Sequence, residues 1–266
     1  RPATRGTNLR VKVKMNLEEI STGVEKKIKV RKLVSCKTCS GTGAKDSSST
    51  QSCSSCRGSG YVTRVANTIL GQMQTTAPCP ACHGEGKTIT SKCPKCSGEG
   101  VVNDEEVLTL NIPAGVGDGM QLSVSGKGNA ARRGGINGDL IVLIEEEAHP
   151  LFQREDHNLI FDHLVAIPDA VLGTTAEIPT LDGKVKVKIE PGTPSGKLLR
   201  LRGKGLPDIN GYGKGDLIVR LLIFVPDNVS KDDRKLLEKM RESATFNPDT
   251  IKKDRSCFLR LRNKFV

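Results

Sequence analysis

The chain has 266 residues, of which 36% are hydrophobic and only 3% aromatic, with no Trp. This composition argues against one large core and favours several small units, some held together by something other than apolar burial. The formal charge of +11 suggests a nucleic-acid partner, but the basic residues are spread along the chain, apart from Lys26–Lys32, and indicate a solvated surface. No apolar run approaches the roughly 20 residues of a membrane helix, so we expect a cytoplasmic protein with no membrane contact.

Residues 1–35 have the pattern of β-strands. In "LRVKVKMNL" the apolar Leu9, Val11, Val13 and Met15 alternate with polar residues, which is typical of a half-buried strand. "LEEISTG" predicts a turn or a short helix, and "VEKKIKVRKLV" resumes the alternation. We therefore expect this segment to form the first part of a β-domain.

Residues 36–100 contain eight of the nine cysteines, arranged as four C-x-x-C-x-G-x-G octets: "CKTCSGTG", "CSSCRGSG", "CPACHGEG" and "CPKCSGEG". Structural zinc takes four thiolates at tetrahedral corners, and each C-x-x-C turn supplies two. The glycines allow the positive φ that turns backbone N–H groups toward the thiolates. The octets therefore predict two closed sites for two Zn²⁺ ions, without the open position that a catalytic zinc keeps. His83 follows Cys82 directly but is a spare ligand, because four cysteines suffice.

Two pairings of the octets are open. Sequential pairing unites the first two octets and the last two. Nested pairing unites the first and fourth octets in one site and the second and third octets in the other, giving the sets Cys36, Cys39, Cys93, Cys96 and Cys53, Cys56, Cys79, Cys82. Nesting leaves "YVTRV" and "LGQMQTT" as the strands of a hairpin, and it brings the ends of the insertion together so that residues 101–155 can continue the domain of residues 1–35.

The rest of the chain contains a duplication. "IPAGVGDGMQLSVSGKGN" from Ile112 matches "IEPGTPSGKLLRLRGKGL" from Ile189, and "GDLIV" occurs at Gly138 and again at Gly215, always 77 positions apart. Both copies have short alternating stretches with Gly, Pro and Asp in the turns. We expect a mainly β fold with two tandem, similar, β-sandwich-like domains, the first formed by residues 1–35 and 101–155 and the second by residues 156–227.

Residues 228–246 predict a helix. Ser230 and Asp233 form an N-cap pair, and Leu236, Leu237 and Met240 follow at helical spacing. Residues 247–266, which include the lone Cys257, have no role that the pattern assigns.

The four octets, inserted into the first of two similar β-domains, resemble one family closely: the DnaJ co-chaperones of the zinc-containing class. The similarity runs from about Asn8 to Met240 and includes "IPAGVGDG", "GDL" and "HPLFQR". It implies nested zinc pairing and a homodimer formed through the helix of residues 228–246. It also implies two partners, unfolded client polypeptides and the 70-kDa heat-shock chaperone of the DnaK type to which clients are delivered.

In members of this family, an extended client segment adds as a strand beside the first β-domain. The positions that match the family's groove are Leu9, Ile28, Val30 and Phe152. One departure concerns the J domain, whose His-Pro-Asp triplet stimulates the partner's ATPase: the single His-Pro here, at His149, belongs to a β-domain. We therefore interpret the chain as the client-binding fragment of such a co-chaperone.

Two alternatives stay open. A zinc-ribbon protein that binds nucleic acid accounts for the charge, but the chain has few aromatic residues for base stacking. A thiol–disulfide isomerase requires a C-x-x-C pair free of metal. No catalytic constellation and no phosphate-binding glycine loop is evident, so the sequence predicts a binding protein and not an enzyme.

Overall fold

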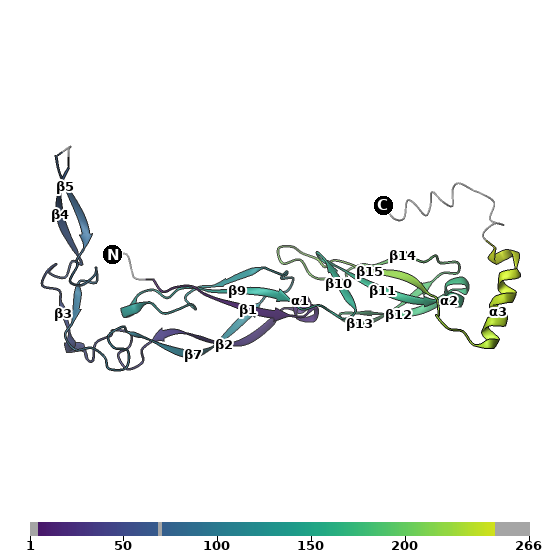
Figure 1. Ribbon diagram of the computed structural model, residues 1–266, viewed down its shortest axis with the longest axis horizontal. Coiled ribbons are helices and arrows are strands. Elements are labelled where there is room, and N and C mark those ends of the chain that lie inside the picture. The colour runs from purple at the N-terminus through teal and green to yellow at the C-terminus, as the bar shows by residue number, and fades with distance from the viewer. Residues whose placement is uncertain (1–4, 69–70, 248–266) are drawn as a thin grey trace. The chain divides into compact units, whose positions relative to one another are not determined.

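The structure is a computed structural model that describes residues 5–68 and 71–247 (Figure 1). It is mainly β, as the sequence predicted, and its sheets are open. The chain separates into two compact units. Unit 1 contains the chain up to Met15, Gly23–Ile112 and Val116–Glu146, and unit 2 contains Asn16–Thr22, Pro113–Gly115 and the chain from Glu147 onward. The boundary between the two β-domains after residue 155 stays a prediction.

Unit 1 is built on a three-stranded sheet and a long hairpin. β1 (Leu9–Met15) pairs in parallel with β9 (Leu140–Glu146), which pairs antiparallel with β8 (Gln121–Val124). β2 (Val24–Ser35) pairs with β7 (Val101–Ile112) over the full length of both strands. Val13 and Met15 of β1 are buried, whereas Arg10, Lys12 and Lys14 are exposed, so β1 has the face expected from its alternation.

The cysteine-rich region leaves β2 at Ser35 and returns to β7 at Val101, which lie opposite each other. It contains two short ladders and one 3₁₀ turn. β3 (Thr50–Ser52) pairs with β6 (Lys87–Ile89), β4 (Tyr61–Thr68) pairs with β5 (Gly71–Pro78), and η1 spans Ser47–Ser49. The β4–β5 hairpin is the one predicted from "YVTRV" and "LGQMQTT". A further 3₁₀ turn, η2 (Arg132–Gly134), precedes β9.

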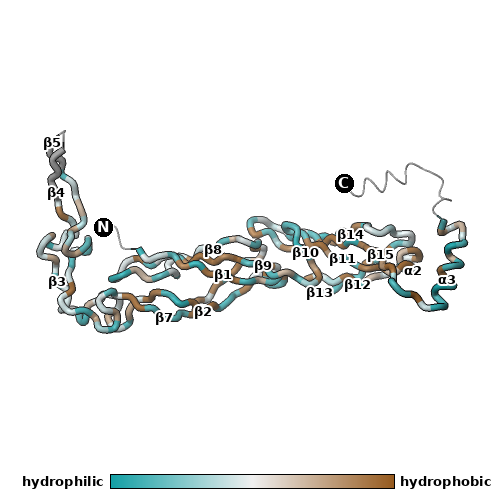
Figure 2. The backbone as a smooth tube through the Cα atoms, viewed as in Figure 1, coloured by the Kyte–Doolittle hydropathy of each residue, from teal (hydrophilic) through white to brown (hydrophobic). Residues whose placement is uncertain are grey.

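Unit 2 contains a four-stranded sheet of order β10–β11–β15–β14 and a two-stranded sheet of β12 and β13. Its strands are β10 (Phe152–Glu155), β11 (Asn158–Ala166), β12 (Thr174–Thr180), β13 (Gly183–Ile189), β14 (Lys197–Leu201) and β15 (Leu217–Phe224). Its helices are α1 (Leu17–Thr22), α2 (Ile167–Leu172), α3 (Lys231–Glu242) and the 3₁₀ turn η3 (Ala244–Phe246). In Figure 2 the most apolar segments follow the strands of both units, where most of the largest fully buried side chains lie.

The duplication is wider in the structure than in the sequence comparison. β7, β8 and β9 correspond to β13, β14 and β15 at the separation of 77. In addition, β1, α1 and β2 correspond to β11, α2 and β12 at a separation of 150, as shown by Leu9 with Leu159 and Gly23 with Gly173. The hairpin β12–β13 closes directly, with Thr180 opposite Gly183. The cysteine-rich region is therefore an insertion into the tip of the equivalent hairpin, β2–β7.

The predicted C-terminal helix is α3, and its N-cap is the predicted one. The Ser230 side chain accepts a hydrogen bond from the backbone N–H of Asp233 at 3.1 Å. The predicted segment 247–266, with Cys257, lies outside the described residues except for Asn247. Among the residues described, no helix is both long and apolar enough to cross a bilayer.

Candidate metal centres and the free edge of β1

The eight cysteines of the octets form two buried clusters. One contains Cys36, Cys39, Cys93 and Cys96 and the other contains Cys53, Cys56, Cys79 and Cys82, and within each cluster the four Sγ atoms lie within 4.8 Å of one another. The arrangement is nested. His83 is exposed and belongs to neither cluster.

Backbone hydrogen bonds dock the octets in reciprocal pairs. In the cluster of Cys53, Cys56, Cys79 and Cys82, which we call the outer cluster because it lies farther along the insertion from β2 and β7, the N–H of Cys53 donates to the C=O of Gly86 at 2.9 Å, and the N–H of Cys79 donates to the C=O of Gly60 at 2.8 Å. The other cluster is the inner cluster. The inner cluster repeats this pattern, with Cys36 donating to Gly100 and Cys93 to Gly43, both at 2.9 Å. The last glycine of each octet also donates its N–H to the second cysteine's Sγ, at 3.2–3.3 Å. Each octet thus holds its partner and orients its own sulfurs.

The sulfur separations fit a zinc ion. Zn–S bonds of about 2.3 Å in a tetrahedron place the sulfurs about 3.8 Å apart. The observed distances are 3.7 Å for Cys39–Cys96, 3.9 Å for Cys53–Cys79 and 3.7 Å for Cys56–Cys82. These pairs are far too widely spaced for disulfides, whose sulfurs are about 2.05 Å apart. The two clusters are compatible with zinc binding, and no further ligand is needed.

The pKa values of the thiols also favour a bound divalent cation. A hydrogen bond from the Cys39 backbone lowers the pKa of Cys36 to about 7, while burial raises the pKa of Cys96 to about 11. Although burial acts to raise it, hydrogen bonds from Gly60 and from Cys82 lower the pKa of Cys56 to about 6. Each cluster therefore ionises one thiol readily and resists a full set of thiolates, which a divalent cation would stabilise.

A second candidate site is the outer edge of β1. In the described part of the chain, β1 pairs only with β9. The N–H of Leu9 donates to the C=O of Asp139 at 2.9 Å. Because consecutive residues of a parallel strand direct their peptide groups to alternate sides, the N–H and C=O groups of Arg10 and Lys12 face away from β9. The carbonyl of Lys14 accepts a hydrogen bond from the Nζ of Lys26 at 2.7 Å, so the free edge of β1 is the stretch Arg10–Lys12.

The predicted groove residues do not all lie in one unit. Leu9 is half-buried in β1, and Ile28 and Val30 lie on β2, half-buried and buried respectively. Phe152 begins β10 in unit 2, where it is 6% exposed and packs against Phe161, with ring centroids 5.7 Å apart. That Phe152 belongs to the same groove as Leu9 stays a prediction.

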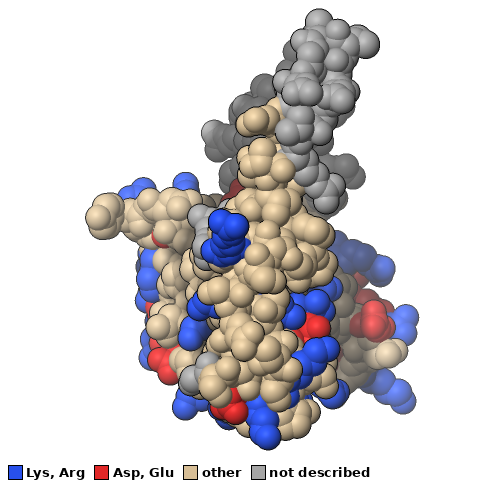
Figure 3. Space-filling view, turned by 90° about the vertical axis from the view of Figure 1, so that its left-hand side faces the viewer, with Lys and Arg blue, Asp and Glu red and all other residues tan. Residues whose placement is uncertain are grey.

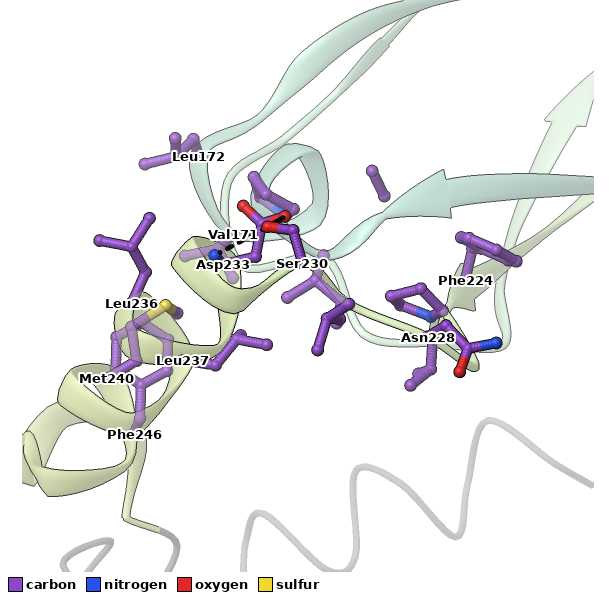
Figure 4. Close-up of a pocket in the computed structure, with 16 residues that line it drawn as sticks. Val171, Leu172, Phe224, Asn228, Ser230, Asp233, Leu236, Leu237, Met240 and Phe246 are labelled. Carbon is purple, nitrogen blue, oxygen red and sulfur yellow. Dashed lines mark hydrogen bonds between the residues drawn. The ribbon is translucent and has the colours of Figure 1, made fainter.

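A cavity of about 810 Å³ lies between α2, the end of β15 and α3 (Figure 4). The sequence reasoning assigned an apolar stripe to α3 but missed this cavity, because its other wall comes from segments distant in the sequence. Figure 4 shows the apolar side chains of α3 and η3 gathered on one side, with Val171 and Leu172 of α2 nearby. No residue of α3 is buried, and Leu236 is 59% and Leu172 75% exposed.

Basic residues form no single block on the face drawn in Figure 3, where blue Lys and Arg atoms are dispersed among tan and red ones. Several basic side chains are paired with acids, among them Lys29 with Glu105 and Arg132 with Glu99 at 2.6 Å. On this face the positive charge is therefore dispersed, as the sequence indicated.

Fold and clusters together define a class: tandem, duplicated β-domains in which a cysteine-rich insertion with two four-thiol clusters interrupts the first copy. Residues 9–226 match the family described as the DnaJ C terminal domain. This match covers both copies and the insertion. The chain belongs to the DnaJ C terminal domain family.

Curated relatives support this membership. The chain is 54% identical over 261 residues to "Chaperone protein DnaJ" of Bacteroides fragilis, an alignment that covers 98% of this chain and 66% of the relative. It is 55% identical over 251 residues to the protein of that name in Bacteroides thetaiotaomicron, covering 94% of this chain and 63% of the relative. For the Porphyromonas gingivalis protein the identity is 51%, with 96% and 67% covered. The chain thus spans about two thirds of the length of these relatives, whose names describe chaperones and not enzymes.

Proposed function

We propose that the chain captures extended apolar segments of unfolded polypeptides by strand addition along the free edge of β1. The observation that supports this most directly is the outward-facing backbone of Arg10–Lys12, beside the half-buried Leu9 and Val11. An unpaired strand edge supplies main-chain hydrogen bonds, and apolar side chains on its inner face supply affinity. The protein of which this chain is part delivers the captured client to the 70-kDa heat-shock chaperone.

The test is a proline at Lys12. It removes an outward N–H and leaves the ladder with β9 intact, because that ladder uses the peptide groups of the neighbouring residues. Losing one hydrogen bond and adding a ring at the edge should cost about 1–2 kcal/mol, or roughly five- to thirtyfold in Kd. Fluorescence anisotropy of a labelled apolar peptide gives the Kd. Lys12→Ala, which keeps the N–H, is the matched control, and equal affinity for both variants would refute strand addition at this edge.

We propose that each cysteine cluster holds one Zn²⁺, giving two ions per chain with a structural role. The matching sulfur separations support this, and a reducing compartment such as the cytoplasm would keep the thiols available. Metal analysis should give two zinc ions per chain, and Cys56→Ser should give one. A thiol–disulfide isomerase would require a C-x-x-C pair that stays free of metal and reactive toward thiol reagents.

We propose further that a second copy of the chain packs on the cavity beside α3, forming a homodimer. α3 has only 12 residues, a length at which an isolated helix is marginal, and its apolar residues line an open cavity. Sedimentation velocity should show a dimer that Leu236→Asp converts to a monomer. Lys235→Asp, on a residue outside the cavity lining, is the control and should stay dimeric.

Salt dependence separates the client-binding proposal from the nucleic-acid alternative. Peptide binding through backbone and apolar contacts should change little between 50 and 200 mM salt, whereas a nucleic-acid complex with several phosphate contacts should weaken by orders of magnitude. The dispersed basic residues and the scarcity of aromatic side chains favour the peptide. If the affinity for the peptide fell steeply as the salt concentration rises, the nucleic-acid alternative would be favoured.

A further inference from the structure

The two copies of the duplicated domain have the same sheet geometry but different edges. In the first copy the strand order is β1–β9–β8, and the corresponding order in the second is β11–β15–β14. Equivalent hydrogen bonds fix both sheets: the N–H of Leu9 donates to Asp139 and the N–H of Leu159 donates to Asp216, both at 2.9 Å. β1 and β11 therefore present equivalent peptide groups at their outer edges.

β10 is the one strand of the second sheet without a described counterpart in the first. It pairs antiparallel with the outer edge of β11, and Phe152, Gln153 and Arg154 lie opposite Phe161, Ile160 and Leu159 respectively. The equivalent positions on β1 are Val11, Arg10 and Leu9, at the separation of 150. β10 thus occupies, on β11, the edge that no described residue pairs with on β1.

Burial differs between the copies as a missing strand requires. Leu159 of β11 and Ile178 of β12 are fully buried. Their counterparts in the first copy, Leu9 and Ile28, are only half-buried. At these two positions the apolar side chains are less covered in the first copy, where no described strand pairs with the outer edge of β1, so they are accessible to a further strand.

We propose that β10 is an internal copy of the bound client, and that a client segment adds antiparallel to β1 in the register that β10 has on β11. This inference rests on the proposed capture of clients at β1 and adds their direction and register. The client's N-terminal end then lies toward Val13 and its C-terminal end toward Asn8. Its backbone bonds to Asn8 and Arg10, the equivalents of Asn158 and Ile160, and, one outward pair further along the same register, to Lys12, the equivalent of Asp162.

The register also assigns the side chains of the client. The position equivalent to Phe152 lies opposite Val11 on the inner face and takes a large apolar residue. In the second copy Phe152 fills this place, stacked on His149 with ring centroids 4.9 Å apart. Val11 is smaller than its counterpart Phe161, which leaves space for a bulky client side chain. The next client residue, equivalent to Gln153, lies opposite the exposed Arg10 on the outer face, where an acidic residue is favoured.

The test uses the sequence of residues 149–156, HPLFQRED, as a synthetic peptide added to the whole chain. A spin label is attached to its N-terminus in one sample and to its C-terminus in another, and the backbone amides of β1 are followed by NMR. We expect the N-terminal label to broaden Val13 more than Asn8, and the C-terminal label to do the reverse. Replacing the peptide's Phe by Ser should weaken binding by roughly tenfold or more, because it removes the large buried side chain.

The outcomes distinguish this inference from the proposal on which it rests. If the labels broaden β1 in the opposite order, or if the peptide broadens β11 instead of β1, the register taken from β10 is wrong. If HPLFQRED does not bind while another apolar peptide does, with sensitivity to Lys12→Pro, the inference also falls but capture at β1 stands. If no peptide binds with sensitivity to Lys12→Pro, capture at β1 itself is refuted.

Discussion

The two glycines of each octet should tolerate alanine very differently, although they are only two residues apart. In the second octet, Gly58 has φ +85° and Gly60 has φ +81°, so alanine at either position is forced into a backbone region that L-residues avoid. This strain costs about 1–2 kcal/mol. At Gly58 nothing more is added, because a Cβ there would lie 3.9 Å from the nearest atom, the Oγ of Ser52.

Gly60 differs because the partner octet packs directly on it. A Cβ at this position would be 2.4 Å from the carbonyl oxygen of Gly84, and a backbone group cannot move aside without separating the two octets. Gly60→Ala therefore adds an overpacking cost of about 1–3 kcal/mol to the strain. The total of roughly 2–5 kcal/mol corresponds to a loss of about 30-fold to several thousandfold in zinc affinity at the outer cluster.

The assay is competition for zinc with a chromogenic chelator, followed to completion for each variant. Gly58→Ala should still bind two zinc ions, but it should release the ion of the outer cluster roughly five- to thirtyfold more readily. Gly60→Ala should retain only the inner ion under the same conditions. The inner cluster offers a replicate, since a Cβ at Gly41 would lie 3.7 Å from Ser35 and one at Gly43 would lie 2.4 Å from Gly98. Equal losses for the two glycines of an octet would refute the packing argument.

Two further predictions concern stability. A backbone hydrogen bond from Gly203 holds the pKa of Asp216 below its usual range. The stability that the ionised Asp216 carboxylate gives the folded protein is therefore fully present above about pH 4, and it is lost as the pH falls through the lowered pKa. Asp216→Asn should destabilise unit 2 at pH 7, with the difference vanishing in acid, as measured by urea unfolding or amide exchange; a pH-independent difference would contradict this. Lys32, whose side chain is 5% exposed, pairs with Glu106 at 2.9 Å. Glu106→Gln should lower the free energy of unfolding by about 1–2 kcal/mol, since a buried ammonium loses its counter-charge. Glu105→Gln, in an exposed pair, should cost less than about 0.5 kcal/mol, and equal urea midpoints for the two variants would contradict this ranking.

The ligands of the two cysteine sites could be predicted from local spacing in the sequence. The C-x-x-C-x-G-x-G octet specifies two thiolates and the turn that orients them, and this geometry is contained within eight residues. The short strands and the N-cap at Ser230 were likewise readable, because alternation and capping are local properties. Their assembly is not local: the spacing of the residues left sequential and nested pairing open, the family resemblance implied nesting, and the contacts between octets place Cys36 near Cys96.

The extent of the duplication was only partly read from the sequence. The separation of 77 was evident because identical residues recur without a gap. The separation of 150 joins shorter identities such as Leu9 with Leu159, Gly23 with Gly173 and Ile28 with Ile178. The insertion of residues 36–100 interrupts the first copy, so its two parts match the second copy at different separations. A search that allowed this insertion would have found β1 and β11 to be equivalent.

Sequence alone thus determined the elements, the thiol chemistry and the existence of a repeated domain, since each depends on residues close together in the chain. Tertiary structure decided which edges are paired. A strand's alternation is the same whether or not a neighbour covers its edge, so "LRVKVKM" could not reveal that β1 has a free side, and "FQRE" could not reveal that β10 covers β11. The cavity beside α3 has the same origin, because its walls come from α2, β15 and α3 and exist only where the fold brings them together.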